Sequence, residues 1–367
     1  AGNYQGAIAL LNKLGISTVD GLESLLNALM ILHVHQPISG NKIASLSCSG
    51  GEASLIADLA EQFNFRFPKL SSKQKRKLKS ALGDLVHLSN PLDYQTYVWN
   101  DQVKLTVAFK TMMEETYDFL FIIMDLPKQG RCSSDSWHPA IAALKEAKKI
   151  AKCPVGLITS LEENMPEKFA KDLIKHSIIP LTGLENSLAA VKALQNVSIQ
   201  WKIKSTPSII WERWPNEKSR VLDEYQSKKV LSRIGINVPK GFVITDKNSL
   251  LNKFRTIKKT VCLKAMGINH KTDVSGVVLG IDNENELLNK FNNMKRLTRS
   301  KEFLIERQVD NCLVELLIGI VRDPQHGFMI TIGEGGVLSE LRKDSVTLCM
   351  PCNRTEIARA LKKLKIW

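Results

Sequence analysis

Short apolar runs alternate with helical patterns between about residue 40 and residue 197. Four runs rich in Ile, Leu and Val have the length and composition of strands buried on both faces of a parallel sheet, namely 42–48, 119–124, 154–159 and 177–181. Apolar residues recur every three or four positions in four other segments, namely 52–63, 139–152, 167–176 and 185–195. Strands and helices that alternate in this way predict a doubly wound α/β domain with a parallel sheet over residues 40–197.

The second half of the chain has a different pattern, in which strands dominate. Helices are predicted at 222–234, 249–257 and 285–297. Strands are predicted at 242–245, 261–265, 276–280, 302–307, 314–321 and 329–332. This order predicts an α+β domain, so we expect two architectures in one chain.

Neither pattern continues through residues 198–221, which we predict to be a linker. Three tryptophans, Trp201, Trp211 and Trp214, are expected to pack on a neighbouring surface through their indoles. Residues 1–39 are too few for a domain and are predicted to be the tail of a preceding one. The first residue is Ala1 rather than Met and no targeting pattern follows it, so we expect the chain to begin inside a longer one. The expected boundaries are therefore 1–39, 40–197, 198–221 and 222–367.

The amino-acid composition limits the classes of protein to which this chain can belong. Of the 367 residues, 44% are hydrophobic and 24% are charged, as in globular proteins, and no apolar run approaches the ~20 residues that would span a bilayer. The net charge of +14 indicates anionic partners. Five basic residues lie between 73 and 79 without interleaved aromatic residues, and we interpret them first as a solvated helix face and only second as a nucleic-acid patch: Lys73, Lys75, Arg76, Lys77 and Lys79.

Cysteine spacing argues against a zinc site and against a disulfide framework. The seven cysteines lie at 48, 132, 153, 262, 312, 349 and 352, and only the last two are close in sequence. We therefore expect reduced thiols and a cytoplasmic protein.

A turn of small residues joins the first predicted strand to the first predicted helix of the α/β domain. Backbone N–H groups of Ser49, Gly50, Gly51 and Glu52 could converge there at the positive end of the helix dipole, which makes a phosphate site. A tight turn with Ser49 as a helix N-cap explains the same residues equally well. An attacking Ser49 or Cys48 is a minority interpretation, because a nucleophile elbow requires a glycine before the serine.

Two residues of the second half suggest phosphate chemistry. Lys264 lies in an apolar strand, where it needs an anionic partner or a route to solvent, and a nucleotide phosphate would be such a partner. His270 lies in a polar turn beside Lys271 and Asp273. An exposed imidazole is more often an ordinary surface residue, but a neutral one can also accept a phosphoryl group.

Several later residues would fit a nucleotide cleft. Glu306 ends one predicted strand and Glu315 begins another, and carboxylates can hold Mg²⁺. Arg322 offers a fork of donors, and Gly335 and Gly336 allow backbone to approach phosphate. The alternatives are a surface ion pair between Arg322 and Asp323 and a hairpin turn at the glycines.

Taken in order, these segments resemble the NDP-forming acyl-CoA synthetases, the superfamily of succinyl-CoA synthetase and ADP-forming acetyl-CoA synthetase. The similarity lies in Ser-Gly-Gly-Glu-Ala at 49–53, Ser-Asn-Pro-Leu-Asp-Tyr at 89–94, the His-Lys-Thr-Asp segment within 263–280, and 314–341 with Arg-Asp-Pro and Gly-Gly. The resemblance implies a flavodoxin-like CoA-ligase domain followed by an ATP-grasp domain.

The resemblance also implies an activity: acid, CoA and ATP would interconvert with acyl-CoA, ADP and phosphate through acyl-phosphate and phosphohistidine intermediates. ATP or ADP, Mg²⁺ and CoA would take part, no metal ligand is assigned, and neither nucleic acid nor a membrane is expected as a partner. The turn at 49–52 would face the phosphohistidine, Lys264 would contact nucleotide phosphates, and His270 matches a relay histidine of the family. Glu306, Glu315, Arg322, Gly335 and Gly336 would complete the nucleotide site.

The chain departs from the family pattern at several points. The principal phosphohistidine and the CoA-binding domain are expected upstream of Ala1 or in a partner subunit, within an oligomer, and the ATP-grasp domain is expected to continue beyond Trp367. Ser275 stands where the family usually has glycine, and Glu334 where glycine or leucine is commoner, and only glycine adopts positive φ freely. Two alternatives stay open, a basic nucleic-acid-binding protein and a regulatory nucleotide-binding module with degenerate catalysis.

Overall fold

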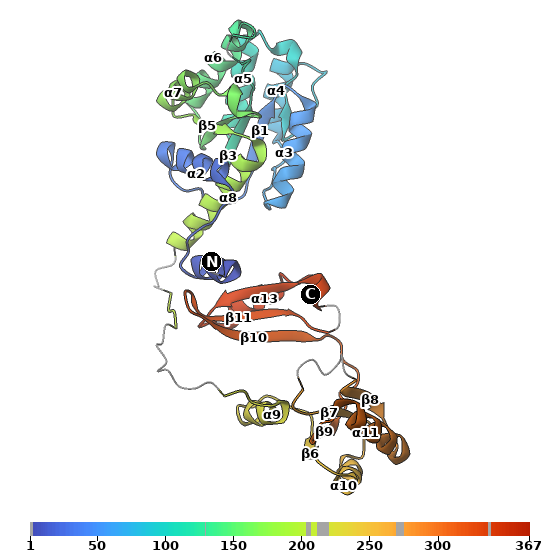
Figure 1. The fold of residues 1–367 in the computed structure, drawn as a ribbon. Helices are drawn as coiled ribbons and strands as arrows, with labels where there is room; N and C mark the ends of the chain where they lie inside the picture. Colours follow the sequence, from blue (N-terminus) through green and yellow to red (C-terminus); the bar gives the residue numbers. More distant parts are fainter. Residues whose placement is uncertain (1–2, 129, 203–206, 211–219, 269–274, 337–338) are drawn as a thin grey trace. The chain divides into compact units, whose positions relative to one another are not determined.

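The structure is a computed structural model that describes residues 3–128, 130–202, 207–210, 220–268, 275–336 and 339–367. Contacts divide the chain into two units (Figure 1). The first unit comprises residues 1–210, 320–330 and 347–360, and the second comprises 211–319, 331–346 and 361–367. This division into units does not test the domain boundaries expected from the sequence, which therefore remain a prediction.

A five-stranded parallel sheet organises the first unit. Its strands follow the order β2 (Leu92–Asp93), β1 (Ile43–Ser47), β3 (Phe119–Ile123), β4 (Val155–Thr159) and β5 (Ile179–Thr182). This order is the flavodoxin-like one, so the predicted fold class is confirmed. Four strands lie within two residues of their expected positions. The fifth, β2, falls in segment 89–94, which the sequence alone suggested was only a turn.

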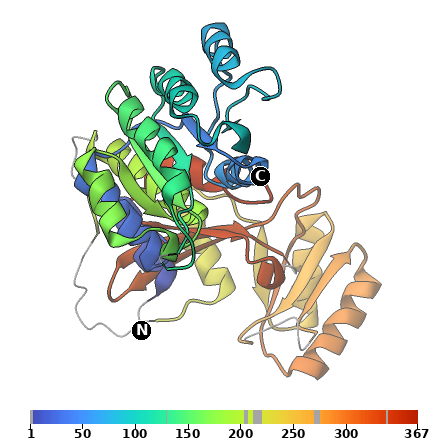
Figure 2. The ribbon, with the colours of Figure 1, turned by 90° about the horizontal axis from the view of Figure 1, so that it is seen from above.

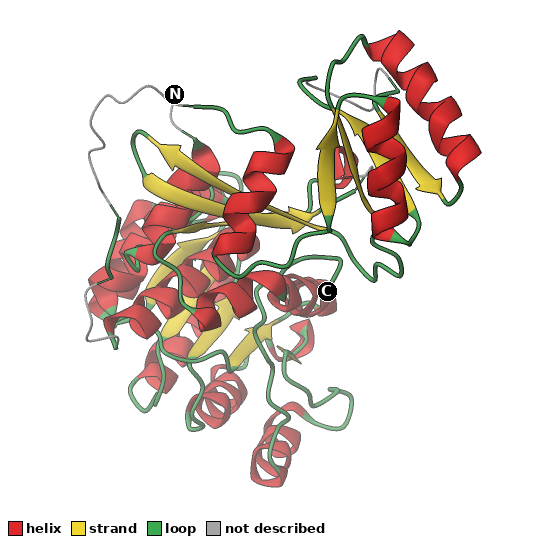
Figure 3. Ribbon diagram, turned by 90° about the horizontal axis from the view of Figure 1, so that it is seen from below, coloured by secondary structure: helices red, strands yellow, loops and turns green. Residues whose placement is uncertain are grey.

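Helices cover both faces of this sheet (Figures 2 and 3). One face packs on α2 (Leu22–Val34), α3 (Gly50–Gln62) and α8 (Leu184–Trp201). The other packs on α4 (Ser72–Leu82), α5 (Gln102–Met113), α6 (His138–Lys148) and α7 (Glu167–Lys175). Alternate residues of β3 supply the two cores, because successive strand side chains point to opposite faces.

The second unit contains a four-stranded antiparallel sheet. Its order is β6 (Gly241–Ile244), β9 (Phe303–Arg307), β7 (Val261–Ala265) and β8 (Val277–Ile281). Two helices, α10 (Lys247–Ile257) and α11 (Glu284–Thr298), cover one face and form its core (Figure 3). The helix α9 (Glu224–Arg233) precedes the sheet and begins with a capping box between Asp223 and Gln226.

A three-stranded sheet has residues in both units. Its order is β10 (Leu316–Asp323), β11 (Gly327–Glu334) and β12 (Ser345–Cys349), with the helices α12 (Ser339–Arg342) and α13 (Arg354–Leu361) in the same part of the chain. The sequence predicted β10 and β11 but not the other three elements.

Within the first unit, the N-terminal helix α1 (Tyr4–Lys13) packs against residues from the far end of the chain. Ala9 forms a small core with Met329 and Cys349. Lys13 Nζ donates hydrogen bonds to the Pro351 carbonyl at 2.7 Å and to Glu356 Oε1 at 3.0 Å. The start of the chain is therefore attached to residues more than 300 positions away.

The first residues of the expected linker, 198–201, belong to a helix. Helix α8 continues to Trp201, whose side chain is 72% exposed, so its indole does not pack as expected. Trp211 and Trp214 lie outside the described residues. All seven cysteines are free thiols, as expected. Within the described ranges, no helix is long and apolar enough to cross a membrane.

Candidate functional site

The turn between β1 and α3, which we call the glycine corner (Ser47–Glu52), lies at the carboxyl edge of the parallel sheet. Ser49 occupies the N-cap position, but its hydroxyl makes no capping hydrogen bond. A Cβ atom on Gly50 would lie 3.3 Å from Asp93 Oδ2, so a larger residue here would crowd the neighbouring strand. The Ser49 side chain therefore does not cap the first N–H groups of α3. A helix start that binds an anion needs N–H groups left uncapped in this way.

Carboxylates gather at the glycine corner. Glu52 Oε2 is buried without a hydrogen-bond partner among the described residues. Burial, followed by the negative charges of Asp125 and Asp93, raises the pKa of Glu52 to about 7. Glu52 can therefore carry a proton near neutral pH and donate a hydrogen bond to an anion rather than repel it.

Two carboxylates at this corner, Asp93 and Asp125, were missed by sequence reasoning. Asp93 ends β2, and its oxygens accept hydrogen bonds from Gln95 N at 2.9 Å and Gln95 Nε2 at 2.6 Å. Asp125 follows β3, and its Oδ1 accepts from Ser160 N at 2.7 Å and Asn164 Nδ2 at 2.9 Å. For Asp125 the available signal was its position just after a predicted parallel strand, whereas Asp93 gave no such signal because segment 89–94 suggested only a turn.

The glycine corner is not arranged for thiol chemistry. Burial and then the charge of Glu52 raise the pKa of the Cys48 thiol to about 11. A nucleophilic cysteine requires the opposite shift, because the thiolate is the attacking species. The geometry thus favours anion binding over attack by Cys48.

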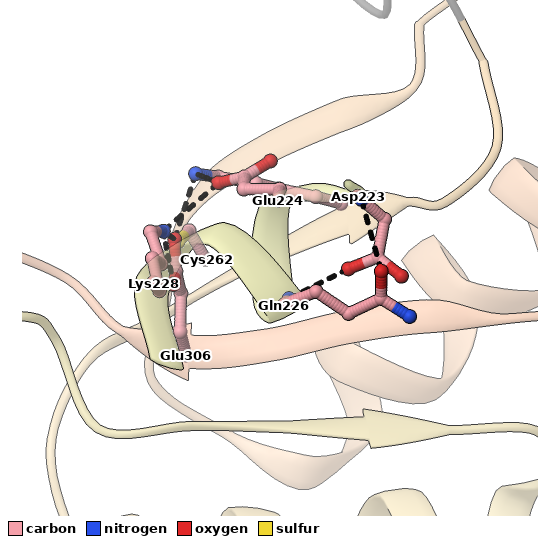
Figure 4. A network of polar contacts seen from close by, with 7 residues as sticks. Asp223, Glu224, Gln226, Lys228, Cys262 and Glu306 are labelled. Carbon is pink, nitrogen blue, oxygen red and sulfur yellow. Dashed lines mark hydrogen bonds and ion pairs between the residues drawn. The ribbon is translucent and has the colours of Figure 1, made fainter. Parts of the chain in front are cut away.

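The second unit holds an ion-pair network formed by Glu224, Lys228, Lys264 and Glu306 (Figure 4). Lys264 Nζ lies 2.6 Å from Glu224 Oε1 and 2.7 Å from Glu306 Oε1. Lys228 Nζ lies 2.9 Å from Glu224 Oε1 and 2.6 Å from Glu306 Oε2. Two lysines and two glutamates thus balance in charge.

Strand alternation explains the position of this network. Leu263 and Ile305 point into the core under α10 and α11, so their neighbours Lys264 and Glu306 point to the opposite face, where α9 supplies Glu224 and Lys228. The sequence indicated that Lys264 needs an anionic partner, and the structure supplies two carboxylates. Sequence reasoning missed Glu224 and Lys228, since their contacts depend on how α9 packs.

Electrostatics within the network hold Lys264 charged. Burial alone would lower the pKa of Lys264, but hydrogen bonds and charge from Glu224 and Glu306 outweigh it and raise the pKa above its ordinary value. Burial, and then the charge of Glu306, raises the pKa of the neighbouring Cys262 thiol to about 11. Lys264 therefore keeps its positive charge at physiological pH.

A cavity of about 230 Å³ lies beside the network. Its lining includes Lys228, Lys229, Lys240 and Glu306. Lys264 is not among its lining residues. Ligand phosphates in this cavity would meet the lysines of α9 first.

The other expected nucleotide residues lie in different places. Gly335 N donates to the Glu315 carbonyl at 2.8 Å, and a Cβ atom on Gly336 would lie 2.9 Å from Glu315 Oε2, so these three residues come together. Both glycines follow β11 and precede α12, not the turn of a β10–β11 hairpin. Arg322 lies on β10 in the first unit. His270 lies outside the described residues.

Two departures from the family pattern have visible structural effects. Ser275 has φ of +54°, in the left-handed region where glycine is preferred. Glu334 accepts a hydrogen bond from Arg342 Nη1 at 2.6 Å. Among the described residues, no group of three or more His, Cys, Asp or Glu side chains is placed to hold a metal ion.

Residues 213–367 match the family model of an ATP-grasp domain. Over 98% of this chain, the sequence is 25% identical to an ADP-forming acetate–CoA ligase of Methanocaldococcus jannaschii, of which it covers 54%. It is 24% identical to the trans-feruloyl-CoA synthase FCS1 of an unknown prokaryotic organism, over all of this chain and 53% of that protein. The chain thus spans about half the length of these curated relatives.

Separate subunits and solved structures also match parts of the chain. The β subunit of ADP-forming acetate–CoA ligase II of Pyrococcus furiosus is 26% identical over 39% of this chain and 64% of that subunit. Acetyl-coenzyme A synthetase 1 of Ca. Korarchaeum cryptofilum, in complex with coenzyme A, Ca-AMPCP and HgCl⁺, is 29% identical, with a TM-score of 0.37 over 39% of this chain and 66% of that chain. In sequence, residues 213–367 thus match an ATP-grasp domain, and nearly the whole chain is similar to ADP-forming acetate–CoA ligases.

Proposed function

We propose that this chain is part of an NDP-forming acid–CoA ligase. The whole protein would interconvert acid, CoA and ATP with acyl-CoA, ADP and phosphate through acyl-phosphate and phosphohistidine intermediates. The observation that carries this proposal is the combination of an ATP-grasp domain with similarity to acetate–CoA ligases over nearly the whole chain. Because those relatives are about twice as long, the activity is assigned to the complete enzyme.

The ion-pair network would form the phosphate-binding side of the nucleotide site. Lys264 is charged and has Glu224 and Glu306 as its partners. Nucleotide binding would then exchange a carboxylate for a phosphate oxygen at Lys264, and Lys228 would keep Glu306 neutralised. Since one buried carboxylate stays paired throughout, the exchange avoids leaving an isolated buried charge.

Glu315, Gly335 and Gly336, which belong to the same unit as the network, are proposed to take part in the nucleotide site. The close approach of the two glycines to Glu315 leaves little space there for a larger side chain. Mg²⁺ would bind together with the nucleotide phosphates, since this cation usually takes only one or two carboxylates from the protein. Bound Mg²⁺ would neutralise charge on the transferring phosphoryl group.

The glycine corner would receive the phosphorylated histidine of the same enzyme. Ser49, Gly50 and Gly51 would offer backbone N–H groups to phosphate oxygens. Glu52, with a pKa of about 7, would offer a proton in a hydrogen bond. This arrangement can accept a dianion despite the two neighbouring carboxylates.

His270 is proposed as a relay that takes the phosphoryl group from the nucleotide. The step forms a bond between a ring nitrogen and phosphorus and breaks the bond between phosphorus and the leaving oxygen of ADP. Mass mapping of the complete enzyme after incubation with ATP should find an acid-labile, base-stable phosphoryl group at His270. If mass mapping finds no phosphoryl group on His270 during turnover, His270 does not take part in the pathway.

The other partners follow from the same chemistry. CoA and a small carboxylic acid would bind in the complete enzyme, together with CoA-binding and histidine-bearing domains in the same chain or in a partner subunit. The similarity to a separate β subunit supports a multi-part, oligomeric enzyme. The cytoplasm, which supplies ATP and CoA, is the proposed location.

The nucleic-acid alternative finds less support. The expected basic cluster lies on α4, where four of its five residues are exposed, as in the solvated helix face that we predicted. Lys77 pairs with Glu114 at 2.7 Å and Lys79 with Asp84 at 2.8 Å, so part of its charge is already neutralised. None of the relatives described above has a name that refers to nucleic acid.

The decisive experiment measures nucleotide binding and turnover of the complete protein. ATP and ADP binding by calorimetry should weaken at least about tenfold in Lys264→Ala, because a charge-assisted contact to phosphate is lost. Lys290→Ala, an exposed lysine on α11, is the matched control and should bind normally. Unchanged affinity of Lys264→Ala would remove this lysine from the site. ADP binding without acid- and CoA-dependent turnover would favour the regulatory module instead.

A further inference from the structure

The proposed ligase chemistry leaves unused a groove between α6 and α7. It has a volume of about 1010 Å³ and opens on the loop that follows β3. Small-molecule sites commonly occupy roughly 300–1,000 Å³, so the groove can enclose one sizeable molecule. All of its lining residues belong to the first unit and to described parts of the chain.

One wall of the groove is cationic. Lys168, Lys171 and Lys175 recur on α7 at a spacing that places them on one helix face, and Lys145 faces them from α6. Four lysines thus line the groove against two carboxylates, Glu167 and Asp172, leaving two net positive charges.

Two of these lysines form ion pairs with the two carboxylates of the groove. Lys171 pairs with Glu167 along α7 at 2.5 Å, and Lys145 pairs with Asp172 across the groove at 2.5 Å. For Lys168 and Lys175, no ion pair is found among the residues that the structure describes. The groove therefore holds two cations that an anionic ligand could neutralise.

The floor of the groove is apolar. Leu126 belongs to the buried residues, and Ile141 and Phe169 pack on the core of the same sheet face while lining the groove. Ser133 and Ser134 add hydroxyl groups from the loop after β3. A ligand that fits both parts needs an anionic group and an apolar segment, because a bare inorganic anion would leave the floor in contact with water.

We propose that the α6–α7 groove binds a small amphiphilic anion, a carboxylate or phosphate monoester that carries an alkyl or aryl segment. The anionic group lies between Lys168 and Lys175, and the apolar segment lies on Ile141 and Phe169. This site is separate from the glycine corner and does not depend on the proposed ligase activity. An acidic peptide is the competing occupant that the test must reject.

Binding is tested on the complete protein by calorimetry with decanoate and decyl phosphate below their critical micelle concentrations. Comparison of the two probes distinguishes a carboxylate from a phosphate ligand. Affinity should rise about fourfold for each added methylene between the hexyl and decyl compounds, because each buried CH₂ contributes about 0.8 kcal/mol. Inorganic phosphate and decanol should each bind at least about tenfold more weakly than decyl phosphate.

The lysines are tested with a matched pair of double variants. Lys168→Ala with Lys175→Ala should weaken decyl phosphate binding at least about tenfold. Lys73→Ala with Lys75→Ala, two exposed lysines on α4, should leave the affinity unchanged. Equal loss in both double variants would mean that only net charge matters, and no loss in either would place the ligand elsewhere. Each result would overturn the proposal.

The labelling rate of a cysteine in the groove can show whether the probe binds there. Cys132 is an exposed thiol that lines the groove, whereas Cys312 is an exposed thiol in the other unit. Bound decyl phosphate should slow maleimide labelling of Cys132 at least about fivefold and leave Cys312 unaffected. Equal labelling rates with and without the probe, or stronger protection by an acidic peptide than by decyl phosphate, would refute the amphiphile site.

Discussion

Glu306 shows how one buried carboxylate can fix the positions of two lysines. The residue is only 2% exposed and accepts from Lys228 on α9 and Lys264 on β7. Removing one member of a buried ion pair usually costs more than the pair contributed, because the remaining charge stays buried without a partner. Experiments on Lys264 must therefore distinguish a loss of nucleotide affinity from a loss of folding stability.

Glu306→Gln should destabilise the second unit by about 3–5 kcal/mol, since Lys228 and Lys264 would then share only Glu224. Urea unfolding followed by circular dichroism measures the change. Glu302→Gln, an exposed residue just before β9, is the control and should change stability by less than about 0.5 kcal/mol. Similar unfolding midpoints for both variants would contradict a stabilising network.

Glu52 should make stability depend on pH in an unusual direction. Its pKa is raised from 4.5 to about 7, so the folded state keeps a proton that the unfolded state releases, and stability falls as the pH rises from about 4.5 to 7. Because Glu52 is partly solvated, we expect a loss of only about 1–2 kcal/mol.

Glu52→Gln should remove this slope, and the variant should be more stable than the wild type at pH 8 but not at pH 4. Urea midpoints measured at half-unit pH steps test the expectation. Glu61→Gln, exposed on the same helix, should keep the wild-type slope. A slope that persists in Glu52→Gln would assign it to another group.

Ser275 should be a site of backbone strain. Its φ of +54° is costly for a residue with a Cβ atom, so Ser275→Gly should stabilise the chain by about 0.5–1 kcal/mol. Thermal unfolding measures the gain, and Ser249→Gly, at a capping box with ordinary φ, should be destabilising instead. A loss of stability in Ser275→Gly would mean that the serine side chain contributes more than its strain costs.

At the scale of elements, sequence patterns located strands better than helices. Runs of Ile, Leu and Val predicted β1, β3, β4 and β7 closely, because buried parallel or central strands are mostly apolar. The helix α4 was expected only as a solvated helix face at 73–79, and the narrow buried stripe of Leu78, Ala81 and Leu82 was not recognised. The two residues of β2 are too few for any periodicity.

Only part of the candidate site could be predicted from the sequence, because contacts between distant segments depend on how strands and helices pack. Residues adjacent in sequence, such as Ser49 to Glu52, were found together. Asp93 and Asp125 join them only because β2 and β3 lie on either side of β1, and strand order is a property of the whole sheet. Glu224 and Lys264 are 40 positions apart and meet only once α9 has packed.

The helix α2 provides a test at the scale of elements. Asn27 is buried, its Nδ2 donates to the Thr182 carbonyl at 2.8 Å, and its Oδ1 accepts from Thr182 N at 3.2 Å. Asn27→Ala should cost about 2–3 kcal/mol, because two backbone groups of β5 lose their partner. Leu26→Ala, 64% exposed on the same helix, should cost much less. Hydrogen exchange at Thr182 that is unchanged in Asn27→Ala would rule out this attachment.

At the scale of the whole molecule, two units with separate cores should unfold separately. The clusters on the two faces of the parallel sheet belong to the first unit, and the cluster under α10 and α11 belongs to the second. Calorimetry should therefore show two transitions. Saturating ADP should raise only one of them, by about 2.7 kcal/mol at a hundred times its dissociation constant. A single transition that shifts as a whole would contradict independent units.

The attachment of α1 near residues 326–356 has a consequence for biosynthesis. Lys13 and its partners Pro351 and Glu356 are separated by 338 and 343 positions, so the ribosome releases the helix long before its binding surface exists. Ala9 must remain exposed until Met329 and Cys349 have emerged. Contacts of such large sequence separation form late and slowly. The apolar face of the nascent helix α1 is therefore a segment that a chaperone would protect until these later residues have been synthesised.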